Sequence, residues 1–307
     1  MNMLSGHAKY IDVLERSLYN GALDGLSLTG DRFFYGNPLA SSGKHSRREW
    51  FGTACCPSNI ARLVSSLGNY IYSTSANAVY VNLFVGSNTK ISLDKNNIAL
   101  SMETGYPWNG NVRINVSPKN KHTFDMHIRI PGWLNEPVPG DLYHYEPGEK
   151  VVPLIKVNGK QTTYETKDGY AVINRHWKKN DVVTIEFPME VKRVISNAAI
   201  KQNLNRVALQ YGPLVYCVEG ADNQGSALNL VVPPGTDFQT FFQPALLGGV
   251  NTIQFEAPVL TVGNDGQSVA TENRKITAIP YFSWNNRGAN EMQVWLPSII
   301  KSIGINE

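Results

Sequence analysis

The spacing of apolar residues predicts two helices near the start of the chain. Residues 10–18 place Tyr, Ile and Leu side chains at helical intervals, and a second apolar stripe follows Pro57 over residues 60–67. Residues 29–53 between them form a long irregular segment, and loops of that length usually carry function. Two helices and a loop cannot bury a core alone, so we expect residues 1–76 either to need partner helices that the chain does not contain or to pack on the residues that follow.

From residue 77 onward the pattern changes to short strands with a period of two residues. In residues 123–130, apolar side chains alternate with Asp125, His127 and Arg129. Because successive side chains of a strand point to opposite faces, this alternation predicts that the three polar residues face outward, away from the core.

The absence of helical patterns between these strands favours antiparallel sandwiches over a parallel α/β sheet. The predicted fold is mainly β, with one antiparallel β-sandwich domain over residues 77–195 and a second over residues 196–307. The helical residues 1–76 precede them as a separate part of the chain.

The composition supports a folded, turn-rich β protein. Of the 307 residues, 42% are hydrophobic and 17% are charged, and Gly (26), Pro (17) and Tyr (14) are plentiful. A net charge of +3 is too small to indicate nucleic-acid binding, and 3 cysteines exclude a disulfide scaffold. The longest apolar runs, such as residues 79–85, are far shorter than the ~20 residues of a membrane helix, so we expect no membrane partner.

The first residues show no export signal. Residues 1–6 have neither a basic start nor a long apolar stretch. We therefore expect a cytoplasmic protein if Met1 is the natural start, and an exported one if a signal precedes Met1.

The adjacent cysteines Cys55 and Cys56 are the most informative pair in the chain. Pro57 suits the first position of a helix, which would place Cys56 at the N-cap and Cys55 just before it. The positive end of a helix dipole favours the thiolate, so the pair is a candidate nucleophile, a candidate metal ligand, or both. Two small buried residues at a helix start are an equally good interpretation. The third cysteine, Cys217, lies in an apolar strand and is predicted to be core.

Other polar and aromatic residues carry weaker signals. We expect the neighbouring charges Glu15 and Arg16 to lie on a solvated helix face, and the basic residues 44–48 to lie on a loop surface. Trp50 and Phe51 precede the cysteines and could form the wall of a sugar pocket, because sugars present apolar faces to aromatic rings.

Several stretches together resemble the β-L-arabinofuranosidase family of glycoside hydrolases, glycoside hydrolase family 127. The resemblance keeps the family's order over nearly the whole chain, and the Cys-Cys-Pro segment is its most specific element. The stretches are residues 10–21, 32–39, 55–57 with the helix that follows, 130–133, 211–217 and 278–282.

This resemblance implies a fold and a mechanism. Members have an (α/α)6 barrel followed by two β-sandwiches, so residues 1–76 would be the last helices of the barrel. The barrel holds a zinc ion bound by one glutamate and three cysteines, and Cys55 and Cys56 match the adjacent two. In this retaining mechanism Cys55 matches the nucleophile and a second glutamate is the acid/base. Tyr35 falls where the family places a tyrosine in the sugar pocket, and Trp50 is a further candidate for substrate binding.

In the family, both glutamates and the third cysteine precede the helix that begins near His7. The chain therefore looks like the C-terminal portion of such an enzyme, with an incomplete zinc site, and we expect it to be inactive alone. Its full-length parent would cleave terminal β-L-arabinofuranosides from an arabinose-containing glycan. The sequence leaves open whether it forms a homodimer.

Two other classes remain as alternatives. One is a non-catalytic β-sandwich module for carbohydrate binding or assembly, which would have no need for adjacent thiols at a helix start. The other is a thiol or zinc protein of unrelated function.

Overall fold

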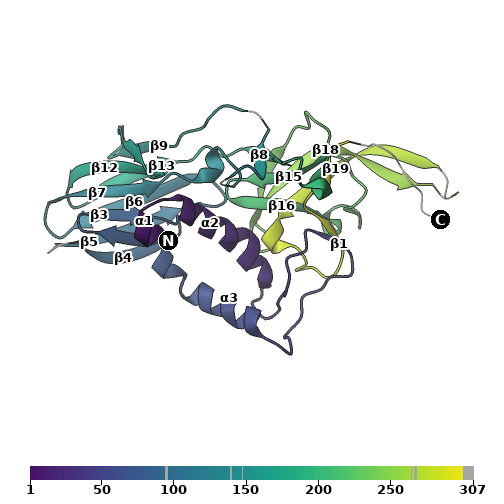
Figure 1. The fold of residues 1–307 in the computed structure, drawn as a ribbon, viewed down its shortest axis with the longest axis horizontal. Helices are drawn as coiled ribbons and strands as arrows, with labels where there is room; N and C mark the ends of the chain where they lie inside the picture. The colour runs from purple at the N-terminus through teal and green to yellow at the C-terminus, as the bar shows by residue number, and fades with distance from the viewer. Residues whose placement is uncertain (94–95, 139, 147, 264, 266–267, 300–307) are drawn as a thin grey trace. The chain divides into compact units, whose positions relative to one another are not determined.

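The structure is a computed structural model that describes residues 1–93, 96–138, 140–146, 148–263, 265 and 268–299. It is mainly β with few helices, as predicted (Figure 1). Two compact units divide the chain. Unit 1 comprises Met1–Arg16, Ala61–Pro139 and Gly148–Glu190, and unit 2 comprises Ser17–Ile60, Gly140–Pro147 and Val191–Glu307. Among the described residues, no helix has both the length and the apolar character needed to cross a membrane.

Among the described residues, the helices lie in the first part of the chain, apart from short 3-10 turns. The main helices are α1 (Asn2–Ser5), α2 (Lys9–Ser17), its continuation through η1 (Leu18–Ala22) and η2 (Leu23–Gly25), and α3 (Cys55–Ser65). The isolated 3-10 turns are η3 (Leu67–Tyr70), η4 (Gly132–Leu134), η5 (Lys201–Asn203), η6 (Gly220–Asp222) and η7 (Tyr281–Ser283).

Helix α3 begins earlier than the sequence predicted. Cys55 is its first residue, so Cys56 is not the N-cap and Pro57 occupies the third helical position. Proline is tolerated there because the amide groups of the first turn have no partner inside the helix. Both cysteines therefore lie in the first turn, where backbone N–H groups are free to face an anion.

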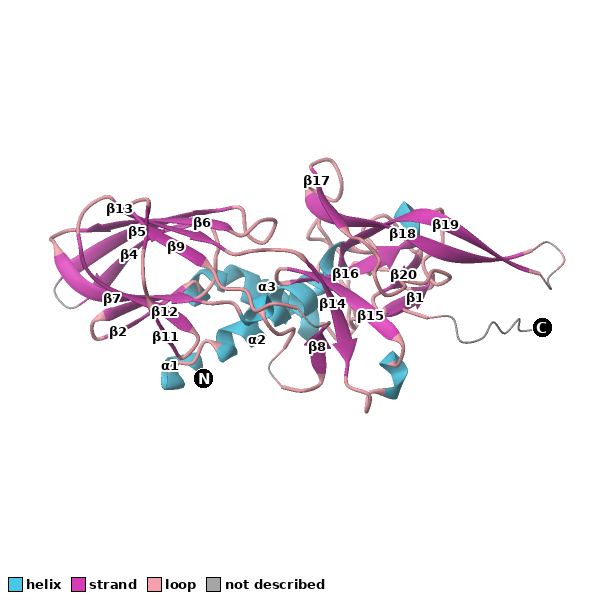
Figure 2. Cartoon of the chain, turned by 90° about the horizontal axis from the view of Figure 1, so that it is seen from above, coloured by secondary structure: helices cyan, strands magenta, loops and turns pink. Residues whose placement is uncertain are grey.

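Unit 1 contains two sheets, which Figure 2 shows as separate layers. In spatial order, the first sheet is β10 (Lys160–Gln161), β9 (Leu154–Val157), β13 (Asp181–Glu186), β6 (Asn111–Pro118), β5 (Asn96–Thr104) and β4 (Ser87–Leu93). The second is β11 (Glu165–Lys167), β12 (Tyr170–Trp177), β7 (His122–Arg129), β3 (Ala78–Val81) and β2 (Tyr72–Ser75). The strands pair antiparallel except β3 and β7, which are parallel and depart from the predicted antiparallel arrangement.

The alternation in β7 holds along most of the strand. Phe124, Met126 and Ile128 are fully buried, as their spacing predicted. His127 on the opposite face is half-buried, not freely exposed, because its ring stacks on Tyr80 at 4.2 Å between centroids. This burial lowers the pKa of His127 below its ordinary value.

The expectation that Arg129 faces solvent is wrong, since its side chain is 0% exposed. Its Nη1 lies 2.6 Å from Asp12 Oδ1, and its Nη2 lies 2.5 Å from Glu15 Oε1. The predicted solvated position of Glu15 is therefore also wrong, because this carboxylate is buried and accepts a hydrogen bond from Tyr106 Oη at 2.8 Å. The ion cluster ties α2 to the second sheet of unit 1.

Unit 2 is built on a ten-stranded sheet. Its main path is β17 (Gln239–Gln243), β18 (Val250–Val262), β19 (Val269–Pro280), β16 (Leu214–Glu219), β15 (Arg206–Tyr211), β14 (Val191–Ser196) and β8 (Tyr143–Tyr145). Off this path, β20 (Glu291–Gln293) pairs with β16 and β1 (Ala40–Ser42), and β21 (Leu296–Pro297) pairs with β15.

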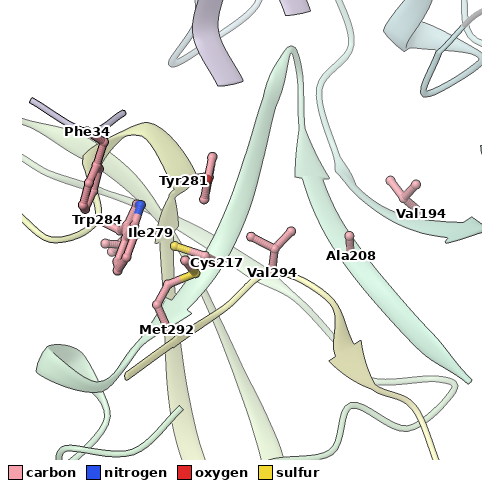
Figure 3. Packing of buried hydrophobic residues seen from close by; sticks show 9 residues of the cluster. All are labelled: Phe34, Val194, Ala208, Cys217, Ile279, Tyr281, Trp284, Met292 and Val294. Atoms are coloured by element: carbon pink, nitrogen blue, oxygen red, sulfur yellow. The ribbon is translucent and has the colours of Figure 1, made fainter. Parts of the chain in front are cut away.

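An apolar cluster on this sheet fixes part of the long loop between η2 and α3. Cys217 is 1% exposed within the cluster, which confirms its predicted core position. Phe34 comes from the loop and stacks on Trp284 with ring centroids 5.1 Å apart (Figure 3). The loop segment before the candidate site is thus anchored in the core of unit 2.

Candidate functional site

The first turn of α3 and the loop residue Tyr35 form a compact site within unit 2. The Tyr35 hydroxyl lies 3.0 Å from Cys55 Sγ, and the two cysteine sulfurs are 3.9 Å apart. All three side chains are exposed, and both cysteines are free thiols. The structure therefore brings together three of the four residues that the sequence singled out.

The hydrogen bond between Tyr35 and Cys55 favours ionisation of the Cys55 thiol. It is the largest cause that lowers the pKa of the Cys55 thiol, followed by the contact with Cys56, and backbone N–H groups of the helix start add to it. The same bond raises the pKa of Tyr35 to about 12, so the phenol keeps its proton near neutral pH. Tyr35 can then donate to a Cys55 thiolate and stabilise it, which makes Cys55 a candidate nucleophile.

Two aromatic residues that precede α3 pack on neighbouring rings of the loop. Phe51 packs edge-on against Tyr35 with ring centroids 5.1 Å apart. The fourth candidate, Trp50, is 57% exposed and packs edge-on against Phe33 at 5.7 Å. Phe51 thus contacts Tyr35 directly. Trp50, the residue before Phe51, contacts Phe33 instead and keeps most of its ring exposed.

The cysteine pair fits half of a zinc site. Two thiolates at ordinary Zn–S distances of about 2.3 Å on a tetrahedral ion are separated by about 3.8 Å, close to the 3.9 Å between Cys55 Sγ and Cys56 Sγ. Within the part of the chain that the structure describes, no group of three or more His, Cys, Asp or Glu side chains could hold a metal. The residues present therefore suit two ligands of a metal site and not a complete one.

Sequence reasoning missed two buried charges near this loop. Arg47, expected on a loop surface, is 6% exposed, and Asp24 is 0% exposed. Burial raises the pKa of Asp24 to about 7, against the opposing effect of the Arg47 guanidinium. The run of basic residues around Arg47 hid its burial, and no pattern around Asp24 in the sequence indicates that it is buried.

Replacing Tyr35 by phenylalanine is expected to slow alkylation of Cys55 by iodoacetamide at neutral pH. Loss of the phenol removes the main cause of the lowered thiol pKa, so the pKa rises and the thiolate fraction falls. Peptide mass spectrometry with fragmentation separates Cys55 from Cys56. The matched control is Tyr70→Phe, at a tyrosine that is 38% exposed, and it should change nothing. An unchanged or faster rate at Cys55 in Tyr35→Phe would contradict the assigned role.

Comparison with known proteins places the chain among the glycoside hydrolases. The family model of the β-L-arabinofuranosidase GH127 catalytic domain matches residues 1–69, that of the GH127 middle domain matches 78–189, and that of the glycoside hydrolase family 127 C-terminal domain matches 191–297. The three models follow one another in the order of a single family. The chain belongs to glycoside hydrolase family 127, which confirms the resemblance seen in its sequence.

Individual relatives agree with this assignment. A non-reducing end β-L-arabinofuranosidase of Bifidobacterium longum is 30% identical over 321 residues, which cover 95% of this chain and 46% of the relative. A solved GH127 β-arabinofuranosidase is 42% identical with a TM-score of 0.94, over 97% of this chain and 47% of the relative. A GH127 β-L-arabinofuranosidase from Geobacillus stearothermophilus is 36% identical with a TM-score of 0.87, over 97% and 48%. The chain spans about half the length of these relatives.

Proposed function

We propose that these residues are the C-terminal portion of a retaining glycoside hydrolase that cleaves terminal β-L-arabinofuranosides, with Cys55 as its nucleophile. The observation that carries the proposal is the 3.0 Å contact between the Tyr35 hydroxyl and Cys55 Sγ in the first turn of α3. The names of the relatives supply the sugar, and their lengths support a parent protein larger than this chain.

The proposed reaction proceeds in two displacements. The Cys55 thiolate attacks the anomeric carbon, a sulfur–carbon bond forms, and the bond to the leaving oxygen breaks as an acid donates a proton to it. Water then attacks the same carbon from the face opposite the sulfur and gives a proton to the conjugate base of that acid, while the sulfur leaves as the thiolate. Tyr35 orients the thiol throughout, and its exposed ring, with that of Trp50, would contact the sugar.

Zinc would be held in part by Cys55 and Cys56, and when bound it would keep these thiols deprotonated near neutral pH. The other ligands and the acid/base would come from parts of the parent that this chain does not contain. In agreement, α3 has only Pro57 buried, and Val64 on its apolar stripe is 43% exposed. A helix with such a face suits residues 1–76 as the last part of an (α/α)6 barrel, followed by β-sandwiches over 77–195 and 196–307.

The test compares the parent protein with the isolated 307-residue chain on an arylated β-L-arabinofuranoside. The parent should hydrolyse it and hold about one zinc ion per chain by elemental analysis. The isolated chain should bind zinc weakly and show no hydrolysis. Turnover by the isolated chain that disappears in Cys55→Ala would show that these residues contain their own acid/base, and would overturn the proposed division of the site.

A further inference from the structure

A buried ion pair lies behind the loop segment that carries Tyr35. Asp24, in η2, is 0% exposed, and Arg47 is 6% exposed. Arg47 Nη2 and Asp24 Oδ1 are 3.6 Å apart, within ion-pair range but longer than a hydrogen bond. Neither side chain has a part in the proposed chemistry, so the position of the pair needs another explanation.

The guanidinium of Arg47 joins separate segments of unit 2. Its Nη1 donates to the backbone carbonyl of Asp24 at 2.6 Å, and its Nη2 donates to the carbonyl of Trp284 at 3.1 Å. The planar guanidinium presents its two Nη groups to two such acceptors in a fixed geometry, whereas all the donors of a lysine lie on one nitrogen. Arg47 therefore fixes η2 against the residue that follows η7.

The same guanidinium lies over the ring of Phe34, with its central carbon 4.3 Å from the ring centroid. Phe34 in turn stacks on Trp284 with an interplanar angle of 18° (Figure 3). A cation over an aromatic face is an attractive contact, and it is stronger when desolvated. The Phe34 side chain is thus held by Arg47 and Trp284 together, one residue before Tyr35.

Backbone hydrogen bonds hold the same segment from both sides. The N–H of Phe34 donates to the carbonyl of Gly25 at 3.1 Å, next to Asp24. Phe33 and Arg48 exchange N–H to carbonyl bonds of 2.8 and 2.9 Å, next to Arg47. These bonds fix the backbone up to Phe34, the residue before Tyr35. The position of the Tyr35 side chain therefore depends on the packing of Asp24 and Arg47.

We infer that Asp24 and Arg47 are positioning residues that hold the segment through Phe34 and so keep the Tyr35 hydroxyl at the Cys55 thiol. The significance of this inference for catalysis rests on the proposed function. The contact between Tyr35 and Cys55 itself can be measured without turnover. Stabilisation of the fold alone is a weak explanation, because buried ion pairs can often be replaced by apolar groups without loss of stability.

The experiment measures iodoacetamide modification of Cys55 relative to Cys56 at one neutral pH, with metal removed by a chelator. In Arg47→Met the ratio should fall by about two- to fivefold, as in Tyr35→Phe. The double variant Tyr35→Phe/Arg47→Met should show no further fall, because Arg47 acts only through Tyr35. Asp24→Asn should lower the ratio in the same direction.

The matched control is Arg32→Met, at an exposed arginine that pairs with Glu49 at 2.8 Å. It should leave the ratio unchanged. An unchanged ratio in Arg47→Met, or a full additional fall in the double variant, would overturn the inference. Cys217 is buried, so its alkylation reports loss of the fold. If Cys217 becomes reactive in Arg47→Met, Arg47→Lys takes its place, and the ratio is measured in Arg47→Lys alone and together with Tyr35→Phe. The alkylation ratio is measured without any turnover. A parent protein that lacks glycosidase activity would therefore refute the proposed function without affecting the inference about Asp24 and Arg47.

Discussion

In the parent protein, Cys55→Ala is expected to lower turnover of an arylated β-L-arabinofuranoside to the background rate while the fold stays intact. The thiol lies in the first turn of α3, 3.0 Å from the Tyr35 hydroxyl, and these groups lower its pKa. Alanine removes the sulfur that forms the covalent bond to the sugar in the proposed mechanism, so that route is lost. Initial rates and a far-UV circular dichroism spectrum check both parts of the prediction.

Two further alanine variants separate the roles of the cysteines. Cys56→Ala should also lose activity, but through loss of metal, so its zinc content should fall. Cys217→Ala should keep activity, because this thiol is 1% exposed in an apolar cluster of unit 2. Substantial turnover by Cys55→Ala would assign the nucleophile to another residue.

Replacing Arg129 by methionine is expected to lower the free energy of unfolding by about 3–5 kcal/mol, because one partner of a buried ion cluster is removed. Its side chain is 0% exposed and contacts Asp12 Oδ1 at 2.6 Å and Glu15 Oε1 at 2.5 Å. Without the arginine, two carboxylates are left together, one of them buried. Denaturant unfolding measured by circular dichroism gives the change directly.

The loss at Arg129 should depend on pH in a defined direction. Burial already raises the pKa of Glu15, and Arg129 opposes that rise. In the variant the pKa of Glu15 should climb further, so the folded state binds its proton at a pH where the unfolded chain has released it. Stability of Arg129→Met should therefore fall as the pH rises from the unfolded pKa of 4.5 upward.

The matched control is Arg175→Met. The Arg175 side chain is 36% exposed and lies 3.5 Å from Asp181 Oδ2. Asp181 is buried, but it also accepts hydrogen bonds from Asn158 Nδ2 at 2.8 Å and from the Lys178 N–H at 3.1 Å. Removal of the partly exposed arginine should therefore cost only about 0–1 kcal/mol. Equal losses of stability at Arg175 and Arg129 would contradict the account of the buried cluster.

Local patterns in the sequence were sufficient for the mainly β character and for the core position of Cys217, because alternation and apolar runs are properties of adjacent residues. They could not show the burial of Arg129, whose partners are more than a hundred residues away in α2. A period-2 pattern assigns charged residues to the outer face, and only the three-dimensional contact shows that this face is covered by a helix at one end of β7.

The residues of the candidate site could be proposed from the sequence, but their geometry could not. The Cys-Cys-Pro motif identified Cys55 and Cys56, yet α3 begins at Cys55 and not after Cys56, because helix assignment from a proline is accurate only to a residue or two. The contact between Tyr35 and Cys55 joins a loop to a helix, and no spacing in the sequence encodes it. Arg47, like Arg129, has partners that are distant in the sequence, Asp24 and Trp284, and the run of basic residues around it gives no sign of its burial.

The most direct test of the central claim is the mass of the Cys55 peptide from the parent protein, stopped by acid during turnover of a slowly released β-L-arabinofuranoside. If Cys55 is the nucleophile, fragmentation should show one pentosyl group on Cys55 and an unmodified Cys56, and the adduct should disappear once the substrate is exhausted. A pentosyl group found on a carboxylate side chain, with Cys55 unmodified during active turnover, would contradict the account.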